Sequence, residues 1–146
     1  MSGSAEIIHY FQINSSIESV FETISSARGI SKWWSRKTTG YSELGALLEL
    51  EFTDKIHWQA QVTQMVPPNE FEIILTRSDS DWLDSTVGFQ LSSGLQTVDV
   101  KFYHKGWKKA NNHYYISCYC WAMYLRILKR YVEFEEFVEY EQRLIV

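Results

Sequence analysis

The chain has 146 residues, a length that suits one domain able to bury its own core. Its net charge is −4, whereas a nucleic-acid binder normally shows a basic excess on one face, so we expect no nucleic-acid partner. Aromatic residues make up 16% of the sequence, which indicates a generous aromatic core, an aromatic-lined cavity or an apolar surface.

The first predicted elements are a strand and two short helices. Alternating apolar residues in AEIIHYFQIN, residues 5–14, predict the strand. The next segment, NSSIESVFETI, predicts a helix that has Ser15 or Ser16 as its N-cap and one apolar stripe. A second short helical segment is expected around ARGISKWWS, residues 27–35.

The middle of the chain predicts antiparallel strands joined mostly by short turns. Asp54-Lys55, Pro67-Pro68 and Ser93-Gly94 are typical turn residues between apolar segments. With the first strand included, we expect six or seven strands, the later ones within residues 47–52, 56–66, 70–77, 82–93 and 95–107.

A long helix is expected to follow, with Asn111 or Asn112 as its N-cap. Its apolar residues fall on one narrow stripe, while Arg126 and its charged neighbours lie outside it. The order of elements predicts an α+β fold, in which the long C-terminal helix lies across the concave face of a curved antiparallel sheet. The stripe consists of Tyr114, Cys118, Trp121, Leu125, Leu128 and Val132.

These segments resemble, in order, the helix-grip fold of the START-like (SRPBCC) superfamily, and within it the Activator-of-Hsp-ATPase-like family. The resemblance rests on the Val20-Phe21 pair, ISKWW, the Pro-Pro turn in VTQMVPPNEFEIILT, Gly106-Trp107 and WAMYLRILKRYVE. The chain is expected to form a single START-like domain, residues 1–146. The resemblance covers about residues 6–133 of it, and residues 134–146 are a C-terminal extension. The resemblance implies a sheet of six to seven strands wrapped around the long helix, with two short helices after the first strand.

Two features predict a cytoplasmic protein. The N-terminus lacks the basic and apolar regions of a secretion signal, and no apolar run approaches the ~18 residues that span a bilayer. Cys118 and Cys120 stand two residues apart in the predicted helix, where their side chains point in different directions. We therefore expect two free thiols.

The sequence contains no motif that predicts a metal, a cofactor or a catalytic residue. Ser85 and Ser117 lie near aromatic positions, but no GxSxG surrounds either of them. Neither HExxH nor a paired CxxC is present. The candidate bases are His9, His57, His104 and His113, of which the last two flank the start of the long helix and could face one another.

Aromatic residues from separate elements are the main functional signal. In the predicted fold they converge on the concave side of the sheet, and a ligand cavity is typically apolar with a few polar groups that orient the ligand. Tyr114, Cys118 and Gln64 are candidates for these polar groups. The predicted cavity residues are Trp34, Trp58, Trp82, Phe89, Tyr103, Tyr114, Cys118 and Trp121.

The favoured function is binding of a small apolar or aromatic molecule, lipids included, in a cavity between the long helix and the sheet. The resemblance leaves two alternatives open: a protein-interaction domain that regulates a chaperone ATPase, and an enzyme of the cyclase or dehydratase type. An enzyme would need an acid or base from His9, His57 or Tyr103. The extension keeps several apolar residues, so we expect it to pack on the outside of the domain or on a second subunit.

Overall fold

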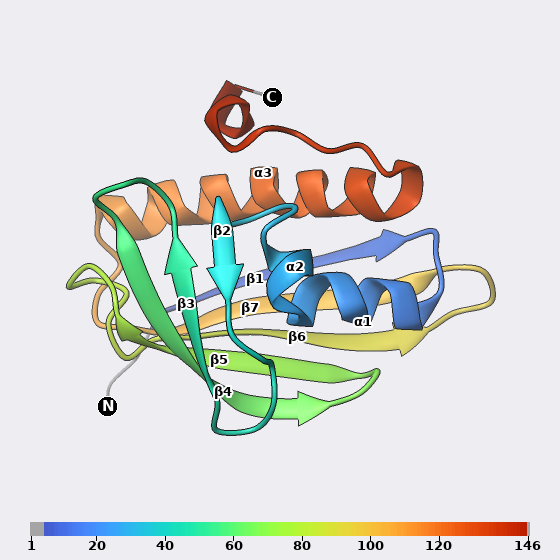
Figure 1. Cartoon of the computed structure of the whole chain (residues 1–146), viewed down its shortest axis with the longest axis horizontal. Coiled ribbons are helices and arrows are strands. Elements are labelled where there is room, and N and C mark those ends of the chain that lie inside the picture. The colour runs from blue at the N-terminus through green and yellow to red at the C-terminus, as the bar shows by residue number, and fades with distance from the viewer. Residues whose placement is uncertain (1–4, 146) are drawn as a thin grey trace.

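Helices cover one face of a seven-stranded antiparallel sheet in the computed structural model, which describes residues 5–145 (Figure 1). In chain order the strands are β1 (Ala5–Ile13), β2 (Lys37–Thr39), β3 (Leu47–Glu51), β4 (His57–Val66), β5 (Glu70–Arg77), β6 (Thr86–Ser93) and β7 (Val98–Trp107). In the sheet they lie in the order β1-β7-β6-β5-β4-β3-β2. The first strand therefore pairs with the last, and β1 forms one edge.

The helices are α1 (Ile17–Ser25), α2 (Ala27–Ile30), α3 (Asn112–Phe134) and a short 3-10 helix, η1 (Tyr140–Ile145). The Ser16 hydroxyl accepts the Ser19 N–H at 3.1 Å, and the Asn111 side chain accepts the Tyr114 N–H at 3.0 Å. Both side chains satisfy backbone donors that a helix start leaves unpaired. The N-caps are therefore Ser16 rather than Ser15 and Asn111 rather than Asn112.

The predicted elements are confirmed, and the structure adds two that were not predicted. One is β2, only three residues long, which pairs with β3 and is too short to show an alternating pattern. The other is η1, in the C-terminal extension. None of the described helices is long and apolar enough to cross a membrane.

The buried face of α3 agrees with the predicted stripe at its centre and departs from it at its ends. Trp121, Leu125 and Leu128 are buried, together with Ser117 and Ile127. The stripe members Tyr114, Cys118 and Val132 are only partly buried. The helix is therefore rotated slightly relative to the prediction, so that its first half presents Ser117 to the interior.

Aromatic rings fill the space between α3 and the middle of the sheet. Trp121 lies at the centre, with its ring centroid 4.6 Å from Phe102 and 5.5 Å from Trp82. Farther along, Phe89 meets Trp33 edge to face at 5.8 Å. Such contacts contribute stability beyond the apolar area they bury.

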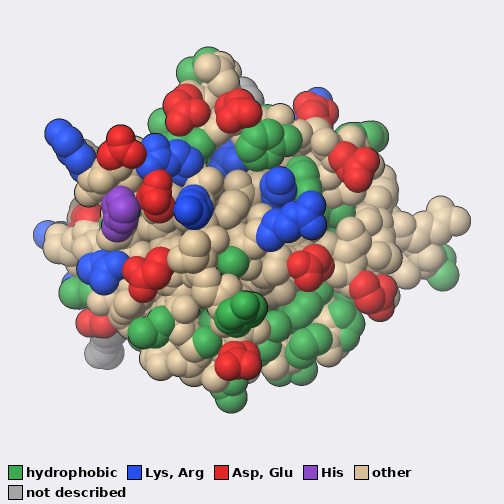
Figure 2. All heavy atoms as spheres, viewed as in Figure 1, with side chains coloured by type: hydrophobic (Ala, Val, Ile, Leu, Met, Phe, Trp, Pro, Cys, Tyr) green, Lys and Arg blue, Asp and Glu red, His purple; other side chains and the backbone are tan. Residues whose placement is uncertain are grey.

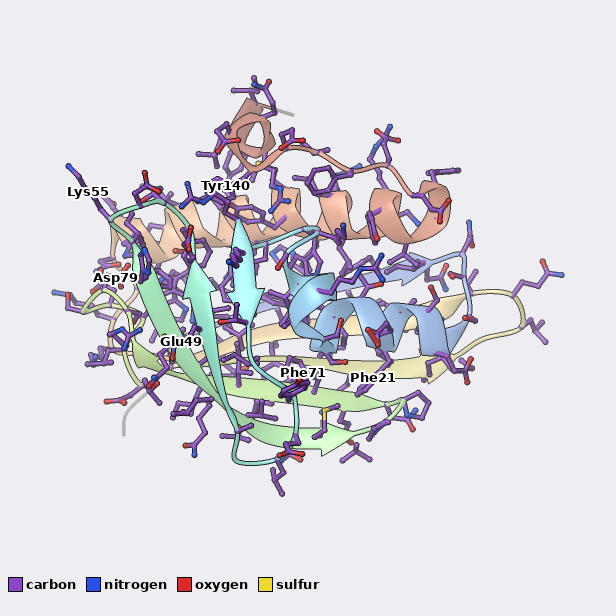
Figure 3. The ribbon with its side chains drawn as sticks, in the orientation of Figure 1. Phe21, Glu49, Lys55, Phe71, Asp79 and Tyr140 are labelled. Atoms are coloured by element: carbon purple, nitrogen blue, oxygen red, sulfur yellow. The ribbon has the colours of Figure 1, made fainter. Side chains whose placement is uncertain are left out.

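The C-terminal extension returns over α3 and packs on its own domain (Figure 1). Arg143 anchors it: this side chain is 1% exposed and donates to the carbonyl oxygens of Val138, Ser35 and Ser31 at 2.9, 2.9 and 3.1 Å. Tyr140, labelled in Figure 3, packs against the core, with its ring centroid 6.4 Å from that of Phe52.

Candidate functional site

A cleft of about 230 Å³ remains where the N-terminal half of α3 meets β4, the neighbouring connecting segments and the extension. We call it the aromatic cleft. The sheet side and its loops contribute Trp34, Phe52, Ile56, Trp58 and Trp82, α3 contributes His113, Ile116, Ser117, Cys120, Trp121 and Tyr124, and the extension contributes Tyr140.

The rings of the aromatic cleft support one another. Trp58 lies 5.0 Å from Phe52 and 5.2 Å from Trp82, measured between ring centroids. Trp34 lies 5.5 Å from Phe52 and 5.2 Å from Trp121. Because each ring is held by its neighbours, the walls are formed before any ligand arrives.

The structure brings together Trp34, Trp58, Trp82 and Trp121 of the predicted cavity residues. It places Phe89 deeper, against Trp33 and Phe102, where it supports the core.

Tyr103 lies on the opposite face of the sheet. Adjacent residues of a strand point to opposite faces, and Phe102 occupies the face that packs on Trp121. The Tyr103 hydroxyl donates to Glu72 at 2.7 Å, and the ring occupies the space that a side chain at Gly88 would need. The predicted role of Tyr103 in the cavity is therefore wrong.

Tyr114 and Cys118 face β1 rather than the aromatic cleft. The Tyr114 hydroxyl donates to the Glu6 carbonyl at 2.5 Å, and the Cys118 sulfur lies 3.9 Å from His9 Nε2. These two residues stand four apart on α3 and share a side of it, which lies away from the cleft. Cys118 and Cys120 are both free thiols, and Cys120 is the one that lines the cleft.

Sequence reasoning missed several cleft residues that had a readable signal. His113, Ser117, Cys120 and Tyr124 follow one another at spacings of four, three and four, which places them on one face of α3 beside Trp121. Tyr140 had no such signal, because its place depends on how the extension folds back.

A buried polar network lies under the cleft. The Trp121 indole N–H donates to His104 Nδ1 at 3.1 Å, and His104 Nε2 lies 2.8 Å from the Ser85 hydroxyl. Because an indole N–H only donates, Nδ1 is the acceptor and Nε2 carries the ring proton. The Ser85 hydroxyl accepts that N–H and in turn donates a hydrogen bond to the Trp82 carbonyl at 2.6 Å.

This network is structural. Burial lowers the pKa of His104 to about 3, so its ring is neutral near pH 7. Neither Ser85 nor His104 is exposed, and neither lines the aromatic cleft. We therefore assign no catalytic role to this serine–histidine pair.

His113 stands at the mouth of the cleft between two acidic residues. Its Nδ1 lies 2.9 Å from Asp81, and its Nε2 lies 3.8 Å from Asp79, which is labelled in Figure 3. The hydrogen bond with His113 lowers the pKa of the Asp81 carboxyl. His113 and His104 do not stack on each other; the Trp82 ring contacts both.

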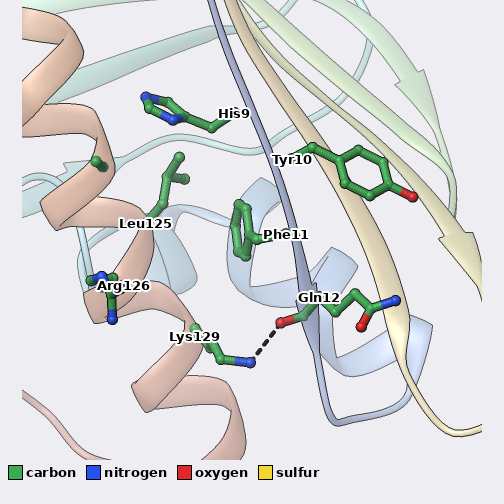
Figure 4. A pocket seen from close by; sticks show the side chains of 8 residues that line it. His9, Tyr10, Phe11, Gln12, Leu125, Arg126 and Lys129 are labelled. Carbon is green, nitrogen blue, oxygen red and sulfur yellow. Dashed lines mark hydrogen bonds between the residues drawn. The ribbon is translucent and has the colours of Figure 1, made fainter.

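Two other hollows flank α3, and charged side chains line both. One, of about 380 Å³, lies between β1 and α3, where Lys129 reaches the Gln12 carbonyl at 2.6 Å (Figure 4). The other, of about 670 Å³, lies between α3 and the extension and includes Arg126, Arg130 and Glu133. On the face shown in Figure 2, acidic and basic side chains are interspersed. Of these three hollows beside α3, the aromatic cleft is the one whose described lining consists mainly of apolar rings.

The architecture defines a helix-grip protein: an antiparallel sheet that packs on a long C-terminal helix, with two short helices after the first strand. Residues 14–133 match the model of the family described as Activator of Hsp90 ATPase homolog 1-like protein, and the chain belongs to this family. The extension, with Tyr140 and Arg143, lies beyond the matched region.

Solved structures share this fold at low sequence identity. The Aha1 dimer from Colwellia psychrerythraea gives a TM-score of 0.81 at 21% identity, over 90% of this chain and 98% of that one. Protein MLL2253 from Mesorhizobium loti gives 0.79 at 14% identity, over 91% and 100% of the two chains. CalU16 from Micromonospora echinospora gives 0.71 at 16% identity, over 96% and 83%. A comparison with curated proteins gives no match.

Proposed function

We propose that the chain binds a small apolar molecule containing a ring in the aromatic cleft. The observation that carries this proposal is the composition of the cleft wall. Among the described residues that form it, the side chains are aromatic or aliphatic apart from His113, Ser117 and Cys120, and none belongs to Asp, Glu, Lys or Arg. A wall of this kind is typical of ligand pockets.

The size of the cleft limits the ligand. Its volume of about 230 Å³ lies below the range of roughly 300–1,000 Å³ common for pockets that hold drug-sized molecules. We therefore favour one or two fused rings over a sterol or a long acyl chain. Burial of about 200 Å² of apolar area would supply roughly 5 kcal/mol before binding costs, which allows affinities no tighter than about 100 µM to 1 mM.

The two cysteines offer a matched test. Cys120 lines the aromatic cleft, whereas Cys118 lies on the β1 side of the same helix. We would titrate the protein with a naphthalene dye and follow tryptophan fluorescence. Cys120→Phe should abolish saturable quenching, and Cys118→Phe should retain it. Equal behaviour of the two variants, or no saturable signal in the wild type, would rule out this site.

A protein partner is the second candidate function, and the outer side of α3 favours it. Tyr115 and Tyr119 stand four residues apart on that side and are 60% and 80% exposed, so they offer two neighbouring rings that a partner protein would cover. The family description names an activator of the Hsp90 ATPase. The test is the ATPase rate of an Hsp90 chaperone with the wild type and with Tyr119→Asp. A rate that the wild type raises and the variant does not would support this function, and an unchanged rate would exclude it.

A further inference from the structure

Ser117 has a hydroxyl proton without an acceptor at the wall of the aromatic cleft. The residue is 4% exposed, and its oxygen accepts the Trp82 indole N–H at 3.3 Å. Since an indole nitrogen only donates, this bond uses a lone pair of the Ser117 oxygen and leaves its proton free. Within residues 5–145, no hydrogen bond takes up that proton.

Two other buried hydroxyls on the helices of this chain behave differently. Thr23 and Ser25 of α1 each donate to the carbonyl four residues earlier, at 2.9 and 2.6 Å. This back-bond is the usual way for a helical hydroxyl to satisfy its donor. Ser117 does not make it, because its hydroxyl is turned toward Trp82. A buried donor without a partner is costly, so an acceptor supplied from the cleft would be favourable.

The surrounding charges decide what kind of acceptor fits. No Lys or Arg side chain lines the described part of the cleft, and Asp79 and Asp81 stand at its mouth around His113. The nearest buried cation, Arg143, is already committed to backbone carbonyls. A carboxylate ligand would meet no Lys or Arg on the described wall, and His113 is already paired with Asp79 and Asp81, whereas a neutral carbonyl oxygen needs no counter-charge.

We propose that Ser117 determines specificity, and that the ligand of the aromatic cleft is a neutral aromatic compound with a carbonyl oxygen that accepts the Ser117 hydroxyl proton. This inference rests on the proposed ligand-binding function and adds the chemical class of the ligand. The ring would lie among Trp34, Trp58 and Trp82, with the carbonyl directed toward α3.

The test compares two ligands of nearly equal shape, 2-acetylnaphthalene and 2-ethylnaphthalene, on the full chain by tryptophan fluorescence. A net hydrogen bond of this kind corresponds to roughly a 3- to 10-fold difference in affinity, so the wild type should prefer the ketone by that factor. The anion 2-naphthoate should bind more weakly than the ketone.

Ser117→Ala should remove the preference for the ketone and leave the affinity for 2-ethylnaphthalene within about twofold of the wild type. The affinity for the ethyl compound also reports whether the cleft is intact after Trp82 loses its acceptor. Ser19→Ala, at an exposed serine of α1, is the matched control and should keep the wild-type preference.

The outcomes separate this inference from the proposed function. If the wild type binds both naphthalenes equally, or Ser117→Ala keeps the preference, the role of Ser117 is excluded while the ligand site stands. If neither compound binds, both proposals fail. Should Ser117→Ala not fold, equal affinity of the wild type for the two ligands would still exclude the role of Ser117.

Discussion

His104 shows at the scale of one residue how burial selects a protonation state. Its two ring nitrogens are engaged by Trp121 and Ser85 in an arrangement that requires one of them to accept. Protonation of His104 at Nδ1 would turn this acceptor into a donor that faces the indole N–H of Trp121. It would also leave a positive charge in a fully buried site. The neutral ring is thus part of the folded structure.

This arrangement predicts that acid destabilises the fold. The unfolded chain protonates His104 near pH 6.5, whereas the folded chain does so only near pH 3, so the unfolded state binds more protons in between. Stability is therefore complete above about pH 6.5 and falls as the pH is lowered toward 3, by at most about 1.4 kcal/mol per pH unit for this group.

The measurement is urea denaturation at pH 7 and pH 5 of the wild type and of His104→Gln. Glutamine can still accept and donate a hydrogen bond but does not titrate. Between these pH values the wild type should lose up to about 2 kcal/mol more than the variant. Equal losses would show that His104 does not resist protonation in the fold.

At the scale of the element, α3 depends on the register of its buried face. Leu125 is 3% exposed, whereas Arg126 beside it is exposed to solvent. We expect Leu125→Ala to lower the free energy of unfolding by about 2–5 kcal/mol, because it leaves a cavity between α3 and the sheet. Arg126→Ala should change it by less than about 0.5 kcal/mol. Chemical denaturation tests both, and small effects at both positions would contradict the register.

The C-terminal extension is a second element whose attachment can be tested. Arg143→Ala would leave the carbonyls of Ser31, Ser35 and Val138 without their donor, so we expect a loss of about 2 kcal/mol or more. Arg130→Ala is the control: Arg130 also ties α3 to the extension, through Glu136, but both side chains are exposed. Its loss should stay below about 1 kcal/mol.

Deletion of residues 136–146 should lower Tm, because it removes both Arg143 and the cover that Tyr140 provides for Phe52. Differential scanning calorimetry gives the shift. An unchanged Tm would mean that the extension contributes nothing to stability in solution.

For the whole molecule, ligand binding and folding are linked. A ligand that binds only the folded chain raises its stability by RT ln(1 + L/Kd), where L is the free ligand concentration, which is about 0.4 kcal/mol when L equals Kd. We expect 2-acetylnaphthalene to raise the Tm of the wild type and of Cys118→Phe in proportion to its affinity, limited by its solubility, and to leave that of Cys120→Phe unchanged. A rise in all these proteins would indicate binding outside the aromatic cleft.

The order of strands and helices was predictable from the sequence because it is written in local patterns. Alternation with a period of two marked the long strands, and a narrow stripe at helical spacing marked α3 around Trp121 and Leu125. Candidate capping residues placed the helix starts to within one residue, at Ser15 or Ser16 and at Asn111 or Asn112, and the structure selects Ser16 and Asn111. Together with the family resemblance, these patterns were sufficient to predict the helix-grip fold and an accumulation of tryptophan beside α3.

Only the tertiary structure decided which aromatic residues form the cleft. Phe102 and Tyr103 are adjacent aromatic residues of β7: Phe102 shares the inward face with Val98 and Val100, whereas Tyr103 shares the outward face with Asp99 and Lys101. Tyr140 comes to the cleft through the contacts of Arg143 with Ser31 and Ser35, more than 100 residues away along the chain. The sequence by itself determined the periodicity of each element, whereas the direction in which each face points depends on contacts between distant segments, which no local pattern records.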